Sequence, residues 1–173
     1  KVKSVPSLHR NGRKKNTIAT IALVGYTSSG KSTLLNTLTA SDIYAQDQLF
    51  ATLDPTTRHL SLQDKQEAIL TDTVGFIQRL PHQLVSAFKS TLEEVAEADL
   101  LLHVVDVSHS TYKKQMDAVY EVLKEIGASD KEIITVYNKI DKVAPESGLL
   151  ERIKDEENCV LVSAKKGIGM DVL

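Results

Sequence analysis

Apolar runs no longer than a β-strand recur along the chain, and segments with helical periodicity alternate with them. In chain order, the runs and the amphipathic segments span residues 18–24, 31–38, 84–98, 100–105, 112–126, 133–137 and 160–162. A strand that is apolar at every position must be covered on both faces, which is typical of a parallel sheet with a helix layer on each side. The chain is therefore predicted to adopt an α/β fold.

The segments 59–62 and 67–71 differ from these runs because they flank a short polar turn. This pattern predicts a hairpin, so we expect one antiparallel edge strand in a mostly parallel sheet of six strands. Residues 40–58 show no sustained period and contain Pro55, which predicts a long loop. Long ordered loops in compact domains usually carry function.

The length of 173 residues and the 42% apolar composition are those of one globular domain, which we place at residues 17–173. The helical pattern that starts at Met170 predicts that the last helix of the domain is truncated. Residues 1–16 carry six basic side chains and no acidic one. They are either a solvated tail or a basic arm beside nucleic acid.

Neither a membrane span nor a secretory signal is evident, so we expect a cytoplasmic protein.

A loop rich in glycine and hydroxyl groups, GYTSSGKST, follows the first apolar run. It fits the pattern G-x-x-x-x-G-K-[ST], in which glycines let successive backbone N–H groups point at phosphate oxygens. The lysine of this pattern reaches the β and γ phosphates, and the hydroxyl after it ligates magnesium. The loop residues expected to bind phosphate or magnesium are Gly25, Tyr26, Thr27, Ser28, Ser29, Gly30, Lys31, Ser32 and Thr33.

A second loop, D-x-x-G, follows the segment 67–71 and consists of Asp72, Thr73, Val74 and Gly75. An aspartate at a strand end often only caps a turn. Ligands of such sheets, however, bind at the carboxyl ends of the strands, where the phosphate loop also lies. We therefore expect Asp72 to hold magnesium, commonly through water, and the Gly75 N–H to contact the γ-phosphate.

The third and fourth loops follow the last two apolar runs and are expected to select the base. Asn138, Lys139 and Asp141 form an N-K-x-D pattern, and residues 163–165 are Ser163, Ala164 and Lys165. A carboxylate at Asp141 can accept two hydrogen bonds from guanine that adenine does not offer, and a site built for such a partner rejects a base without it. A backbone N–H of residues 163–165 would meet the guanine O6. The four loops predict a GTP site and disfavour an ATP-dependent kinase.

The order and spacing of these loops resemble the Ras-like G domain of the P-loop NTPases over almost the whole chain. The stretches DQLFATLDPTTR (47–58) and TDTVGFIQRLPHQLVSAFKSTLEEVAEADLLLHVVD (71–106) resemble, more narrowly, the HflX family of GTPases, in the superfamily of TrmE, Era and Obg. The resemblance implies binding of GTP and GDP with Mg²⁺, hydrolysis of GTP, and association with the large ribosomal subunit, including its rRNA. It also implies that ribosomes are split or rescued. We expect a monomer.

The resemblance further implies that a first switch comprises Phe50, Ala51, Thr52, Leu53 and Asp54. Thr52 would close on magnesium and the γ-phosphate, with Thr56 and Thr57 as alternatives. The catalytic residues would then be Lys31, Thr52 and Gly75, and the metal ligands Ser32, Thr52 and Asp72. Family members also carry an N-terminal domain and a basic helical linker, and residues 1–16 would be the end of that linker.

Two departures from related sequences affect the mechanism. Ser28 and Ser29 stand where the family usually has Asn-Ala, an asparagine that helps related GTPases to hold potassium, so potassium stimulation is left open. Phe76 stands where Ras-like enzymes place a glutamine that orients the attacking water. Phenylalanine makes no hydrogen bond, so hydrolysis is expected to be slow without a partner. The alternative is a ribosome-binding module gated by its nucleotide, with negligible hydrolysis of its own.

Two side chains inside apolar runs are expected to be structural. His103 lies within LLHVVD and Cys159 within NCVLVS, and burial in the core is the simpler assignment for each. The polar residues Gln78, Arg79 and His82 follow the second loop, where surface or partner contact is favoured over catalysis.

Overall fold

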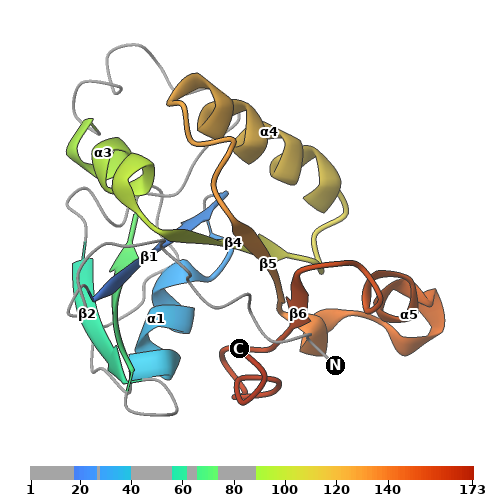
Figure 1. The fold of residues 1–173 in the computed structure, drawn as a ribbon. Helices are drawn as coiled ribbons and strands as arrows, with labels where there is room; N and C mark the ends of the chain where they lie inside the picture. Colours follow the sequence, from blue (N-terminus) through green and yellow to red (C-terminus); the bar gives the residue numbers. More distant parts are fainter. Residues whose placement is uncertain (1–17, 27, 40–55, 62–65, 74–88) are drawn as a thin grey trace.

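The computed structural model describes residues 18–26, 28–39, 56–61, 66–73 and 89–173 of the chain (Figure 1). Six strands form one sheet in the order β2-β3-β1-β4-β5-β6. Their bounds in chain order are β1 (Ala19–Gly25), β2 (Thr56–Ser61), β3 (Glu67–Asp72), β4 (Leu100–Asp106), β5 (Ile133–Asn138) and β6 (Cys159–Leu161). Every neighbouring pair is parallel except β2 and β3. The predicted α/β fold with one antiparallel edge strand is confirmed.

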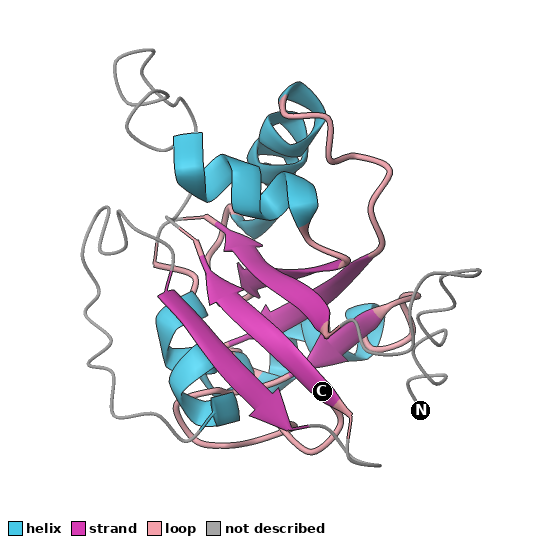
Figure 2. Cartoon of the chain, turned by 60° about the vertical axis from the view of Figure 1, so that its left-hand side comes forward, coloured by secondary structure: helices cyan, strands magenta, loops and turns pink. Residues whose placement is uncertain are grey.

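Helices cover both faces of this sheet (Figures 1 and 2). Helix α1 (Lys31–Thr39) lies on one face, while α3 (Lys89–Glu97) and α4 (Tyr112–Glu125) lie on the other. The short helix α5 (Leu149–Ile153) follows the 3₁₀ turns at Ile140–Lys142 and Pro145–Ser147, beside the β6 edge. Among the described residues, no helix combines the length and the apolar character needed to cross a bilayer.

Each face of the sheet carries its own core because successive strand side chains point to opposite sides. On the α1 face, Leu34 and Leu35 pack against alternate residues of the strands, including Leu102 of β4. On the opposite face, Val95 of α3 and Val119 of α4 pack with the strands and are fully buried. The unbroken apolar runs are therefore explained by burial on both sides.

A third apolar cluster extends the core beneath α5. It joins Val105, Tyr137 and Ile153, and it includes Cys159, which is 7% exposed. The Cys159 thiol donates to the carbonyls of Ile153 and Glu156. The prediction that Cys159 is a core residue is confirmed, and so is the one for His103, which is 1% exposed.

Some boundaries differ from the predicted ones. Strand β2 begins at Thr56, so the prediction of a loop through residue 58 is wrong for residues 56–58. This edge strand has the polar sequence TTRHLS, which carries no apolar run. Helix α5 was not predicted because five residues give too short a pattern. Residues 169–172 form turns, and residues 1–16, 40–55 and 84–88 lie outside the described part of the chain.

Candidate functional site

The loop between β1 and α1 has the geometry of a phosphate cradle. Strand β1 ends at Gly25 and α1 begins at Lys31. Gly30 adopts φ 99°, and a Cβ atom there would overlap the Asn138 Nδ2. A Cβ atom on Gly25 would lie 2.5 Å from the Val104 carbonyl oxygen. Close packing therefore requires both glycines of the motif, and the backbone conformation requires Gly30 as well.

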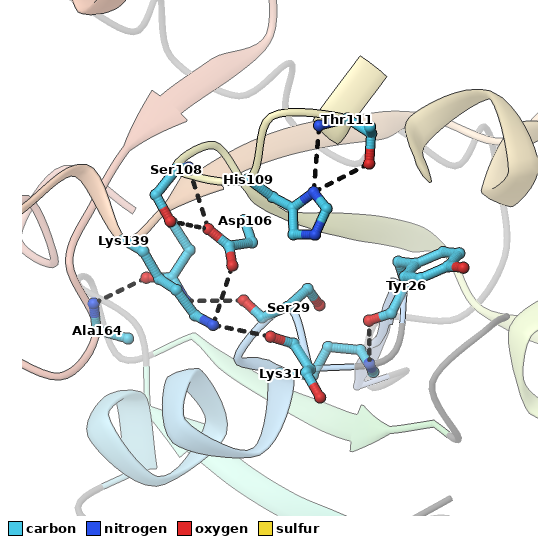
Figure 3. Close-up of polar contacts among 11 residues, drawn as sticks. Tyr26, Ser29, Lys31, Asp106, Ser108, His109, Thr111, Lys139 and Ala164 are labelled. Atoms are coloured by element: carbon cyan, nitrogen blue, oxygen red, sulfur yellow. Dashed lines mark hydrogen bonds and ion pairs between the residues drawn. The ribbon is translucent and has the colours of Figure 1, made fainter. Parts of the chain in front are cut away.

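Lys31 is a buried cation at the mouth of this loop. Its side chain is only 7% exposed, and its Nζ donates to the Tyr26 carbonyl oxygen at 3.3 Å (Figure 3). Burial lowers the pKa of Lys31 to about 8, and the nearby Asp72 carboxylate partly opposes this effect. The charged form still dominates at neutral pH. A buried charge is costly unless an anion accompanies it, so the site favours a phosphate ligand.

Ser32 and Asp72 come together beside Lys31. The Ser32 hydroxyl donates to the Asp72 carboxylate at 2.6 Å, and Asp72 is 2% exposed. The adjacent Thr73 hydroxyl donates to the Leu23 carbonyl at 2.5 Å, which fixes the end of β3 against β1. A hydroxyl and a carboxylate are the hard oxygen donors that Mg²⁺ prefers. This pair therefore fits the predicted magnesium site.

Asn138 connects the phosphate loop to the base loop. Its Nδ2 donates to the Ser29 carbonyl at 3.0 Å, and its Oδ1 accepts from the Ala164 N–H at 3.0 Å. Asn138 is 2% exposed, so both hydrogen bonds are shielded from water. One side chain at the end of β5 thus holds together loops that are far apart in the sequence.

Lys139 makes a second connection to the phosphate loop (Figure 3). Its backbone has φ 64°, and its Nζ donates to the Ser28 carbonyl at 2.8 Å and to the Asp106 carboxylate at 3.1 Å. The Asp106 carboxylate also accepts from the N–H and the hydroxyl of Ser108, at 3.0 and 2.5 Å. Asp106 is therefore a site residue that the sequence analysis missed. It closes β4 as Asp72 closes β3, and the same strand-end rule could have found it.

Asp141 is held as an ionised acceptor at the rim of the site. Its Oδ1 accepts from the buried Ser163 hydroxyl at 2.7 Å, and the Lys166 ammonium lies 3.9 Å from its Oδ2. The hydrogen bond from Ser163 is the main cause that holds the pKa of Asp141 below its usual range. A carboxylate ionised at neutral pH can accept hydrogen bonds from two donors of a base edge.

Most residues predicted for the site fall in the described segments. Those brought together at the carboxyl ends of the strands are Gly25, Tyr26, Ser28, Ser29, Gly30, Lys31, Ser32, Thr33, Asp72, Thr73, Asn138, Lys139, Asp141, Ser163, Ala164 and Lys165. Those outside the described residues are Thr27, Phe50, Ala51, Thr52, Leu53, Asp54, Val74 and Gly75, and Phe76 also lies outside the described part of the chain. The first switch and the γ-phosphate contact of Gly75 stay predictions.

The fold and the site define a P-loop nucleotide-binding domain of the Ras-like type. The family model described as "50S ribosome-binding GTPase" matches residues 20–139. The chain belongs to this family and, within it, to the HflX GTPases.

Relatives and solved structures agree with this assignment. The chain is 55% identical to the GTPase HflX of Lacrimispora saccharolytica and 54% identical to that of Caldanaerobacter subterraneus, over 95% and 96% of its length. It spans 38% of the length of each relative. A GTP-binding protein from Sulfolobus solfataricus, solved in complex with GDP, has a TM-score of 0.69 and 32% identity, covering 89% of this chain and 49% of that one.

Proposed function

We propose that the chain is a GTP-binding and GTP-hydrolysing switch that associates with the large ribosomal subunit in the cytoplasm. The observation that carries this proposal is the pair of hydrogen bonds made by Asn138, which join the phosphate loop and the base loop. A ligand that fills both loops must carry a phosphate chain at one end and a base at the other. The family description supports the ribosomal partner.

The preference for guanine rests on Asp141. Its carboxylate, oriented by Ser163, would accept hydrogen bonds from the guanine N1–H and the exocyclic amine. Adenine offers no such pair, and an unpaired polar group in a site of this kind weakens binding by orders of magnitude.

Titration of the chain with GTP, GDP and ATP, with and without magnesium, tests this preference. The variant Asp141→Asn should lose the preference for guanine, while Asp130→Asn, on an exposed turn, should keep it. Equal affinity for adenine and guanine nucleotides in the unmodified chain would refute the proposal.

Hydrolysis would use groups on either side of the phosphate loop. The Lys31 ammonium would neutralise charge on the β and γ phosphates, and Ser32 and Asp72 would hold magnesium, together with Thr52 as the resemblance implies. Magnesium bound there supplies positive charge to the phosphate oxygens. Phosphoryl transfer depends mainly on this neutralisation and on positioning.

Phe76 stands at the position where Ras-like enzymes have the residue that orients the attacking water, and its side chain cannot make a hydrogen bond. We expect the ribosome to complete the site, and completion by a partner accelerates related reactions about 10³- to 10⁵-fold. Single-turnover hydrolysis measured with and without large subunits tests this expectation, and equal rates would contradict it.

The second candidate function is a docking module whose nucleotide only gates binding to the subunit, and Phe76 favours it. Phosphate release and subunit binding, measured together with GTP, GDP and a non-hydrolysable analogue, separate the two candidates. Phosphate release that the large subunit stimulates would support the hydrolysing switch and, with it, a role in splitting or rescuing ribosomes. Binding that depends on the nucleotide without release supports the module.

A further inference from the structure

A cleft lies outside the nucleotide site, between the β4–α4 loop and α5. Its volume of about 710 Å³ is in the range of ligand-binding pockets. One wall consists of residues 107–114, which run from the end of β4 into the first turn of α4. The other wall carries Leu149, Arg152, Ile153 and Glu156, from α5 and the turn after it.

The charged groups of this cleft are mainly cationic. Lys113 and Lys114 are exposed at the start of α4, and Arg152 is exposed on the opposite wall. Within the described residues, neither lysine pairs with a carboxylate. Glu156 is the one carboxylate among the lining residues, all of which are described, and it accepts a hydrogen bond from the Tyr137 hydroxyl at 2.6 Å. The cleft therefore presents an excess of unpaired positive charge.

Hydroxyl groups line the wall that also carries the two lysines. Ser108, Ser110 and Thr111 line the same wall, with the exposed imidazole of His109 among them (Figure 3). Hydroxyl groups and lysines are the side chains that contact phosphate and sugar oxygens of nucleic acids. The lining also includes the apolar residues Val107, Leu149 and Ile153, of which Leu149 is partly exposed. A polymer with a negative backbone and flat bases matches this combination better than an inorganic anion does.

The same wall is connected to the nucleotide site. Its first hydroxyl, on Ser108, donates to the Asp106 carboxylate, and Asp106 pairs with Lys139. Lys139 in turn donates to the Ser28 carbonyl of the phosphate loop. The backbone of Val107 also donates to the Asn138 carbonyl. A displacement of this wall would therefore act directly on residues that hold both the phosphate loop and the base loop.

We propose that this cleft binds the phosphate backbone of RNA through Lys113, Lys114 and Arg152, and that its occupation is linked to nucleotide affinity through Asp106. This inference rests on the proposed association with the large ribosomal subunit. The linkage is reciprocal, so RNA changes nucleotide affinity by the factor by which nucleotide changes RNA affinity.

The test is fluorescence anisotropy of a labelled oligouridine at two salt concentrations, with the chain saturated with GDP or with a non-hydrolysable GTP analogue. The variant Lys113→Gln/Lys114→Gln is compared with Lys124→Gln/Lys131→Gln, which removes the same charge at and beyond the far end of α4. Arg152→Gln tests the opposite wall. Binding of a labelled GTP analogue by each variant is measured in parallel.

Loss of two phosphate contacts should make the salt dependence of log K shallower by about 1.4 and weaken binding at low salt at least about tenfold. The control pair should change neither quantity. Equal RNA affinity in all variants would overturn the proposal while leaving the nucleotide function intact, because GTP binding is read out separately. Lysine-dependent binding of an acidic polyglutamate peptide, without binding of RNA, would also overturn it. RNA binding that leaves GDP affinity unchanged would refute the linkage through Asp106.

Discussion

His103 makes the stability of the chain depend on pH in a predictable way. This histidine of β4 is 1% exposed, and its ring meets Tyr120 of α4 edge to face with centroids 5.1 Å apart. Within the described part of the chain, its Nδ1 has no hydrogen-bond partner. Burial, helped by the positive charge of Lys31, lowers the pKa of His103 from 6.5 to about 4. The folded chain therefore keeps this imidazole neutral.

The sign of the effect follows from this lowered pKa. Above pH 6.5 the imidazole is neutral in both states, so it imposes no penalty on folding. As the pH falls from 6.5 towards 4, the unfolded chain binds a proton that the folded chain does not. Each pH unit in this window removes about 1.4 kcal/mol from the free energy of unfolding. Acidification to about pH 5 should therefore cost about 2 kcal/mol.

The variant His103→Phe keeps an aromatic ring beside Tyr120 and removes the titrating group. Urea unfolding followed by circular dichroism at pH 7.5 and pH 5, without nucleotide, should show a loss about 2 kcal/mol smaller in the variant than in the unmodified chain. The control His59→Gln replaces an exposed imidazole, which is hydrated in both states, and should behave like the unmodified chain. An identical pH dependence in His103→Phe and the unmodified chain would refute the reasoning.

Two further predictions concern the nucleotide site. Asn138→Ala removes both buried hydrogen bonds between the loops and leaves the Ser29 carbonyl and the Ala164 N–H unpaired. The free energy of unfolding should therefore fall by about 2–5 kcal/mol. The affinity for GDP should also fall at least about tenfold. Isothermal titration at a temperature where the variant is folded measures this affinity. An unchanged affinity would show that nucleotide binding does not need this connection between the loops. Ser32→Ala should abolish the gain in GTP affinity that magnesium gives, as measured with a fluorescent analogue in magnesium and in EDTA, and should leave the affinity in EDTA unchanged. A full magnesium effect in this variant would exclude Ser32 as a ligand.

The central strands were predictable because their burial on both faces leaves an unbroken apolar run, as in β1 and β4. Edge strand β2 gives no such signal, since the sequence TTRHLS has a polar residue at most positions. Helix α5 is placed by its packing on the cluster around Tyr137, which is a tertiary contact that a local pattern does not contain.

The site was predictable where loops have a fixed spacing and was missed where only one acidic residue marks a strand end. The phosphate loop combines its glycines, lysine and serine in nine residues, which allows few other interpretations. Asp106 stands alone at the end of β4, and its partner Lys139 comes 33 residues later. The connection made by Asn138 was also hidden, because the N-K-x-D pattern assigns that side chain to the ligand, whereas both of its polar ends contact the protein.

The close packing behind Gly25 has a practical consequence for anyone who needs an inactive version of the chain. A side chain there would push against the Val104 carbonyl and separate β1 from β4, the two strands at the centre of the sheet. Cells that carry such a variant would contain little of the folded protein, so its phenotype would say little about the role of nucleotide binding. The exchange Asp141→Asn leaves the central strands unchanged and is the better choice for a loss-of-function allele.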